Sequence, residues 1–242
     1  MNEKHDESKI HATVSTKIQD YLGEFVYGGI DGSVTTFAVV AGSTGANLDS
    51  SIVIILGFAN LLADGFAMSV GSYLSSKSEQ AMYDKHLQTE YWEIDNMPEV
   101  EREEIREIYQ NKGFEGKLLE DVVNVICSDK DRWANVMMKE ELELIPDKKS
   151  ALTIGGMTYL SFIIIGIIPL IAYVWDYAVQ QLNNVFWISC TLTMFAFIGI
   201  GWLKSSVTQT SKTKSILETL LLGALAAAVS YFVGDLLEQL IK

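Results

Sequence analysis

Cysteine, proline and positive charge are all scarce in this chain. Its 242 residues include two cysteines and three prolines, and 18 Lys and Arg stand against 31 Asp and Glu, for a net charge of −13. The two cysteines, Cys127 and Cys190, lie in different regions and do not form a disulfide framework. So acidic a chain offers no basic face for phosphate groups, which argues against nucleic acid as a partner.

The sequence motifs of common enzyme classes are also missing. We find no nucleophilic triad and no phosphate-binding loop, and the glycines around Asp31 do not follow a strand as a dinucleotide fingerprint requires. A di-iron oxidase would need Glu-x-x-His pairs, and the chain has none. The start of the chain, MNEKHDESK, is too polar for a secretory signal peptide. We therefore expect neither an enzyme nor a prosthetic group.

Long hydrophobic runs, in contrast, are abundant, because the hydrophobic 49% of the chain is segregated from its charge. A bilayer crossing needs about 20 mostly apolar residues. Five runs have this length, and they predict an all-α polytopic membrane protein with five transmembrane helices. The predicted spans are Phe25–Gly45, Ser51–Ser75, Ala151–Val174, Val185–Leu203 and Ser215–Leu237.

The remaining segments complete the predicted domain organisation. Residues 1–24 are polar, and helical spacing from about Ile18 suggests a short amphipathic surface helix. Residues 25–76 hold the first two spans and residues 150–242 the last three. Between them, residues 77–149 carry 19 Asp or Glu and 11 Lys or Arg, a net charge of −8. We interpret this insert as an acidic helical metal-binding domain.

Breaks inside the acidic insert divide it into several helices. Proline cannot sit in a helix interior without losing a hydrogen bond, so Pro98 should end one helix and begin another, with Asn96 as its cap. Lys112-Gly113 should end that second helix. Two further helices are predicted over residues 114–126 and 131–144, the last closed by Pro146.

The distribution of Lys and Arg fixes the predicted topology. With five spans and the N-terminus inside, every Lys and Arg except Lys242 lies on the inner side, and the outer loops carry none. Positively charged loops are typical of the cytoplasmic side of a membrane. The sequence therefore predicts that residues 77–149 are cytosolic.

Polar residues within the first two spans are candidates for an ion path. A carboxylate in the bilayer is costly, by at least about 2.5 kcal/mol, and usually marks a functional site, although Asp31 could instead cap a helix end near the interface. Asn60, Asp64 and Met68 are four residues apart and share one helix face, where Met68 could also be plain packing. Asp31 and Met68 fall about 6–8 Å from the bilayer centre at similar depth. We therefore predict that Asp31 and Met68 share a cation, and that Asp64 and Asn60 belong to the same translocation path.

The acidic insert carries a second candidate cation site. Glutamates occur in i,i+3 pairs on either side of Pro98: Glu90 with Glu93, and Glu101 with Glu104. Four carboxylates brought together repel one another, and a divalent cation would relieve that repulsion. A charge run is also commonly a solvated face, and this alternative stays open.

A later helix of the insert could complete this second site. Met137, Met138 and Glu141 share a helix face, although adjacent methionines are commonly core residues. Thioethers with carboxylates suit Fe²⁺ better than Mg²⁺ or Ca²⁺, which prefer oxygen ligands alone. The helix adds to the site only if it packs against the glutamate pairs.

Three segments give the chain a family resemblance. The stretches YGGIDGSVTTFAVVAG (27–42), NLLADGFAMSVGSYLSSKSE (60–79) and MMKEELEL (137–144) resemble the vacuolar iron transporter family. The resemblance implies a homodimeric antiporter that exchanges protons for Fe²⁺, and often Mn²⁺, to remove the metal from the cytosol. It implies translocation roles for Asp31 and Met68. The cytosolic metal ligands that it implies are Glu90, Glu93, Glu101, Glu104, Met137, Met138 and Glu141.

Several questions stay open at this level. The sequence does not choose among Fe²⁺, Mn²⁺, Zn²⁺ and Co²⁺, or between a transporter and a metal-sensing membrane protein that moves nothing. A homodimer could form through the small residues Gly28 and Gly32. The short chain favours a bacterial plasma membrane, with a vacuolar membrane as the alternative.

Overall fold

The computed structural model describes residues 20–147, 149–179 and 184–241, and every helix or strand in these ranges is an α-helix. The chain divides into two compact units. The first, Met1–Tyr73 with Lys149–Lys242, is called the hydrophobic unit here, and the second, Leu74–Lys148, the acidic unit. The surface helix predicted near Ile18 falls mainly on residues 1–19, outside the described ranges.

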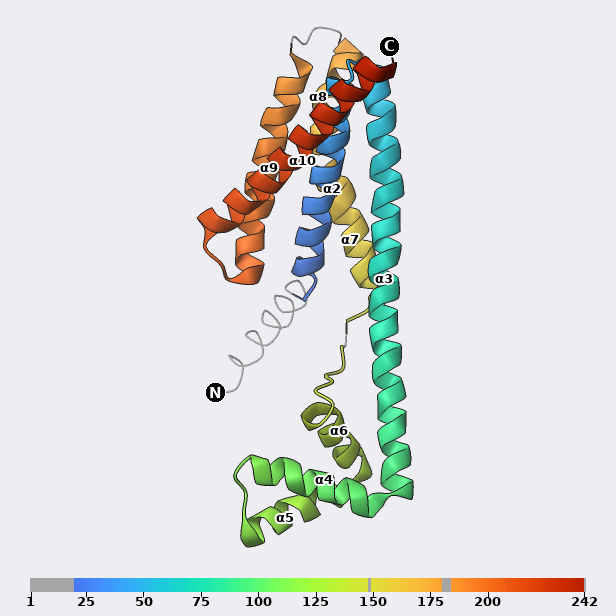
Figure 1. Cartoon of the computed structure of the whole chain (residues 1–242), viewed down its shortest axis with the longest axis vertical. Coiled ribbons are helices and arrows are strands. Elements are labelled where there is room, and N and C mark those ends of the chain that lie inside the picture. The colour runs from blue at the N-terminus through green and yellow to red at the C-terminus, as the bar shows by residue number, and fades with distance from the viewer. Residues whose placement is uncertain (1–19, 148, 180–183, 242) are drawn as a thin grey trace, which may run out of the picture. The chain divides into compact units, whose positions relative to one another are not determined.

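The hydrophobic unit is built around α2, which packs against α7, α9 and α10 (Figure 1). Small and hydroxyl-bearing residues let these helices approach closely, as is usual between membrane helices. The helices of this unit are α2 (Leu22–Gly45), the first part of α3 (Ser50–Asn96), α7 (Ala151–Gly166), α8 (Ile168–Val179), α9 (Val185–Thr208) and α10 (Lys212–Ile241).

Four helices, α2, α3, α9 and α10, are long and apolar enough to cross a membrane, and the bent pair α7 and α8 makes a fifth span if counted as one. The span predicted over residues 151–174 is thus divided between α7 and α8, which meet at an angle of 47°. Pro169 lies in the first turn of α8, where its missing N–H needs no helical partner but also cannot continue α7.

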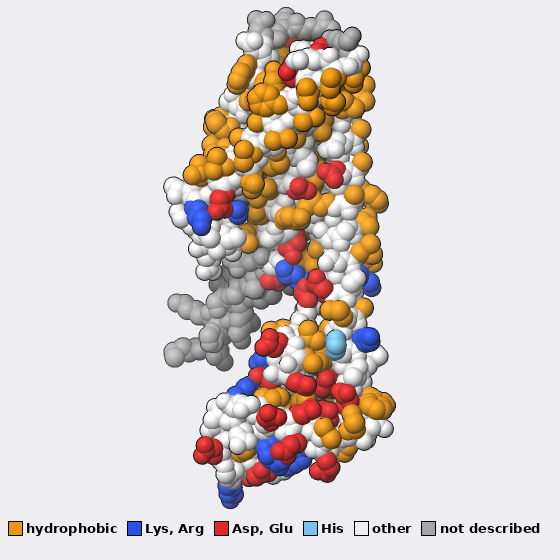
Figure 2. All heavy atoms as spheres, viewed as in Figure 1, with side chains coloured by type: hydrophobic (Ala, Val, Ile, Leu, Met, Phe, Trp, Pro, Cys, Tyr) orange, Lys and Arg blue, Asp and Glu red, His pale blue; other side chains and the backbone are white. Residues whose placement is uncertain are grey.

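Apolar side chains cover much of the outer surface of this unit. Only 11% of the most apolar 18-residue stretch of α10 is buried in the protein. Leu221, Leu225 and Phe232 are among its exposed side chains. On the face drawn in Figure 2, hydrophobic side chains spread over the hydrophobic unit, whereas acidic side chains gather on the acidic unit. Exposed apolar area on this scale is typical of a surface solvated by lipid.

Two glycines of α2 make the close contact with α7 possible. A Cβ atom on Gly28 would overlap Ser161, and one on Gly32 would overlap the backbone of Phe162, so both positions require glycine. Both residues are buried within this one chain. The hypothesis that Gly28 and Gly32 form a homodimer contact is therefore wrong, because α7 of the same chain already covers them.

The acidic unit contains the second part of α3, α4 (Pro98–Asn111), α5 (Gly116–Cys127) and α6 (Lys130–Glu140). Its core is formed by Ile94, Ile105, Val123, Trp133 and Met137, together with neighbouring apolar side chains. Every helix therefore contributes to one small hydrophobic core. This core sets which faces of α3, α4 and α6 point inward.

The helix breaks predicted from the sequence agree with the structure in part. The break before Pro98 is confirmed, but the Asn96 amide donates to the Trp92 carbonyl instead of capping α4. The final helix ends at Glu140 rather than 144, and Glu143 has a left-handed φ of 55°. The second predicted span continues without a break past Ser75 to Asn96 as one helix, α3.

Candidate metal sites

Two glutamates of the acidic unit are buried. Glu90 on α3 is 4% exposed and Glu101 on α4 is 3% exposed. In each, Oε2 is fully buried and has no hydrogen-bond partner among the described residues. A buried carboxylate without a partner is destabilising unless it is protonated or bound to a cation. For these two residues, the solvated-face interpretation is therefore wrong.

Other glutamates surround this pair closely enough to shift its ionisation. Burial, then Glu141, Glu93 and Glu104, raise the pKa of Glu90 to about 7. Burial, then Glu104, Glu90, Glu93 and Glu141, raise the pKa of Glu101 to about 7. The pKa values of Glu104 and Glu141 are also raised, first by burial and then by neighbouring carboxylates. The structure thus brings together all five glutamates predicted from the sequence.

The local sequence explains why these carboxylates turn inward. Ile94 follows Glu90 by four residues on α3, and Ile105 follows Glu101 by four residues on α4, so each glutamate shares a helix face with a core isoleucine. The predicted methionines are buried too, Met137 at 0% and Met138 at 1% exposure. Met137 belongs to the hydrophobic core, so packing alone accounts for its burial.

The five glutamates lie near one another but are not arranged as the ligands of one metal ion. Within residues 20–147, 149–179 and 184–241, no three His, Cys, Asp or Glu side chains are arranged so that they could hold a metal ion. Metal ligation by the five glutamates, Met137 and Met138 therefore stays a prediction.

In the hydrophobic unit, Asp31 on α2 lies close enough to Asp64 on α3 for the two carboxyl groups to interact electrostatically. Both are half-buried. The alternative in which Asp31 caps a helix end is excluded, because α2 begins at Leu22 and Asp31 lies well inside it. Two intramembrane acids at one place are typical of a site for protons or cations.

The other two residues predicted for this path lie on the same face of α3 as Asp64. Nδ2 of Asn60 is buried and has no hydrogen-bond partner among the described residues. Met68 is half-buried and packs against the core that contains Leu61 and Phe162. The nearest electrostatic partner of Asp31 is thus Asp64, and a cation shared by Asp31 and Met68 stays a prediction.

Sequence reasoning missed one polar contact of the hydrophobic unit. Glu24 and Lys149 form an ion pair of 3.0 Å, and Ser150 N–H donates to the Tyr21 hydroxyl beside it. Oε2 of Glu24 is buried and accepts no hydrogen bond from any residue that the structure describes. Glu24 precedes Asp31 by seven residues, two helical turns, so both lie on one side of α2. This spacing could have identified Glu24 from the sequence as a residue on the same side of α2 as Asp31.

The fold and these sites define a polytopic α-helical membrane protein with paired acids in its spans and a separate acidic helical unit. The model of the VIT family matches residues 22–235, and the chain belongs to this family. Its members are membrane transporters, so the chain is a transporter and not an enzyme.

Curated relatives match almost the whole chain. A protein of Toxoplasma gondii named vacuolar iron transporter is 32% identical over 98% of this chain and 80% of its own length. A Tulipa gesneriana protein named vacuolar iron transporter 1 is 33% identical over 95% of this chain and 90% of its own. The Arabidopsis thaliana protein of that name is 31% identical over 91% and 87%.

Proposed function

We propose that this protein is a divalent metal transporter that moves Fe²⁺, with Mn²⁺ as a second cargo, out of the cytosol in exchange for protons. The names of its relatives support iron as the cargo. The acidic unit would bind the ion on the cytosolic side, and the hydrophobic unit would pass it through the bilayer. This division assigns a different task to each cluster of carboxylates.

The convergence of five glutamates, two of them buried, is the observation that carries this proposal. A pKa of about 7 means that Glu90 and Glu101 are poised to lose protons near neutral pH. A divalent cation would replace those protons and cancel the repulsion among the carboxylates. Sulfur from Met137 or Met138, once turned toward the cluster, would favour Fe²⁺ over Mg²⁺ and Ca²⁺.

In the hydrophobic unit, Asp31 and Asp64 would receive the metal between α2 and α3. Asn60 and Met68, on the same face of α3 as Asp64, would offer an amide oxygen and a thioether as further ligands. Carboxylates must be deprotonated to bind a metal, so each arriving ion would displace protons. Proton antiport follows if Asp31 is reprotonated from the far side.

The host membrane and the oligomeric state complete the proposal. The curated relatives reported above are named for the vacuole, which supports the vacuolar alternative over the bacterial plasma membrane. We propose a homodimer, formed by a face other than that of Gly28 and Gly32, with the N-terminus and the acidic unit in the cytosol.

Flux measurements in proteoliposomes test the transport function. Fe²⁺ is supplied under anaerobic conditions, with and without a pH gradient, and Mn²⁺, Zn²⁺ and Co²⁺ serve as competitors. We expect metal uptake that rises with an opposing proton gradient and disappears when an ionophore collapses it. Uptake indifferent to the gradient would refute antiport, and no uptake above protein-free liposomes would refute transport.

A metal-sensing protein is the second candidate, because the acidic unit forms its own compact unit with its own core. A sensor would bind metal on its glutamates but move none. Binding without flux in the assay above would favour this candidate.

A further inference from the structure

The turn between α9 and α10 concentrates positive charge and hydroxyl groups. Between Trp202 and Glu218 the sequence holds three lysines, Lys204, Lys212 and Lys214, and Glu218 is the single acid. Seven serine and threonine side chains lie in the same stretch. Among the described residues of the hydrophobic unit, Lys149 is the only cation outside this turn.

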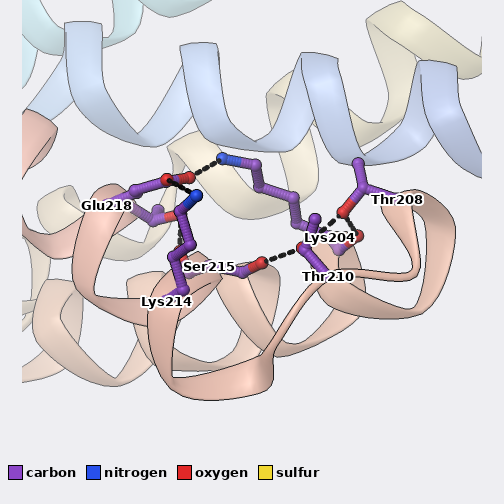
Figure 3. A network of polar contacts seen from close by, with 7 residues as sticks. Lys204, Thr208, Thr210, Lys214, Ser215 and Glu218 are labelled. Atoms are coloured by element: carbon purple, nitrogen blue, oxygen red, sulfur yellow. Dashed lines mark hydrogen bonds and ion pairs between the residues drawn. The ribbon is translucent and has the colours of Figure 1, made fainter.

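Hydrogen bonds hold the turn in a defined conformation (Figure 3). The Thr210 hydroxyl is 2.7 Å from the hydroxyls of both Thr208 and Ser215, and the Thr208 hydroxyl donates to the Lys204 carbonyl at 3.0 Å. Thr208 ends α9 and Ser215 lies in the first turn of α10. The lysines are thus carried on a fixed turn.

Glu218 neutralises only part of this charge. Its carboxylate pairs with Lys204 at 2.9 Å and more loosely with Lys214 at 4.0 Å, as Figure 3 shows. Lys214 is 71% exposed in its side chain. Lys212 has no carboxylate contact among the ion pairs of the described residues and lies 5.8 Å from the centre of the Trp202 ring. One carboxylate against three ammonium groups leaves an excess of positive charge.

The position of the turn fits the surface of a bilayer. It joins two helices long and apolar enough to span a membrane. Trp202, six residues before the end of α9, is 52% exposed. Exposed tryptophan beside lysine is the usual composition at the depth of lipid headgroups. The excess charge therefore lies where phosphate groups of lipids are found.

We propose that the α9–α10 turn binds the phosphate of an anionic phospholipid through Lys212 and Lys214. The hydroxyls of Ser211 and Thr213, which hydrogen-bond each other at 2.9 Å, offer further donors to the same phosphate. The Trp202 ring lies against the acyl region below the headgroup. Glu218 competes with the lipid for Lys214, so the carboxylate limits the affinity of the site.

The test uses the full-length protein in a neutral detergent, titrated with phosphatidylglycerol or with phosphatidylcholine, and counts bound lipid by native mass spectrometry. The variant Lys212→Gln/Lys214→Gln keeps the Lys204–Glu218 pair and so preserves the turn. At about fivefold in affinity per lysine near a charged lipid, we expect this variant to bind phosphatidylglycerol roughly 30-fold more weakly than the wild type. Phosphatidylcholine should bind both equally and weakly.

Two further variants make the result specific. Lys117→Gln/Lys139→Gln changes the net charge equally on the acidic unit and should retain wild-type lipid binding. Glu218→Gln, which removes the competing carboxylate, should bind phosphatidylglycerol about fivefold more tightly. Inorganic phosphate at equal concentration should displace no lipid. Equal affinity of the wild type and Lys212→Gln/Lys214→Gln for phosphatidylglycerol would overturn the proposal, as would equal affinity of the wild type for the two lipids.

Discussion

The two units of this protein use carboxylates in opposite ways. In the hydrophobic unit a single pair, Asp31 and Asp64, lies among apolar helices with few charges nearby. In the acidic unit five glutamates share one region, and ion pairs such as Arg106–Glu120 and Lys130–Asp95 stand on other faces of its helices. A few costly acids in a membrane suit passage of an ion, whereas many acids beside water suit its capture.

The largest expected effect comes from removing the intramembrane acid. Asp31→Ala should reduce metal flux to the level of protein-free liposomes, because a cation in the span then loses one of its two anionic ligands and keeps only Asp64. Equilibrium metal binding by the acidic unit should be unchanged, as measured by titration calorimetry on the same preparation. Normal flux in this variant would refute the role of Asp31.

Neutralising the two buried glutamates should weaken capture. Glu90→Gln/Glu101→Gln should lower metal affinity by roughly 10- to 100-fold, since two charged ligands are lost from one site. Flux should fall at limiting metal and recover at saturating metal. The variant Glu99→Gln/Glu115→Gln carries the same charge change at exposed positions and should bind normally; equal losses in both variants would show a general charge effect instead.

The comparison also shows what the sequence could and could not reveal. The i,i+3 spacing identified the glutamate pairs, and Pro98 identified the boundary between their helices. The burial of Glu90 and Glu101 depends on how α3, α4 and α6 fold around Ile94 and Ile105, which local spacing does not determine. Likewise, Asp64 was predicted by its position within a span, but its closeness to Asp31 depends on the three-dimensional arrangement of the helices in the hydrophobic unit.

The bend at Pro169 is a similar case. Proline is tolerated in membrane helices when neighbouring groups satisfy the freed backbone, so its presence within a hydrophobic run does not by itself predict a break. The hydropathy of residues 151–174 is that of one span, and only the three-dimensional packing separates α7 from α8. The prediction of a homodimer contact at Gly28 and Gly32 was wrong for a similar reason. Small residues serve contacts within a chain as well as between chains, so their presence does not tell which contact they make.

The metal-free acidic unit should be more stable at low pH. Glu90 and Glu101 have a pKa near 7 when folded but 4.5 when unfolded, so stability should fall as pH rises from 4.5 to 7. Glu90→Gln should raise the unfolding free energy of this unit at pH 7.5 by on the order of 2 kcal/mol. Hydrogen exchange of the α4–α6 amides in the full chain measures the stability of the acidic unit. Slower exchange at pH 7.5 than at pH 5, after correction for intrinsic rates, would contradict the expected loss of stability with rising pH.

Metal affinity should show the opposite dependence on pH. Below pH 7 the buried glutamates hold protons that the metal must displace, so affinity should weaken by roughly tenfold per pH unit for each proton released. Titration calorimetry in buffers of different ionisation enthalpy counts those protons directly. We expect proton release near pH 6.5 that is clearly smaller in Glu90→Gln/Glu101→Gln; release of equal size in both proteins would exclude these residues as its source.

The division of labour between the units is tested most directly by measuring equilibrium Fe²⁺ binding and initial Fe²⁺ flux on the same proteoliposome preparations of the two variants. We expect Asp31→Ala to bind metal but transport none, and Glu90→Gln/Glu101→Gln to bind metal weakly yet transport it at saturating concentration. If each variant instead loses binding and flux together, capture and passage are not separate tasks of the two units.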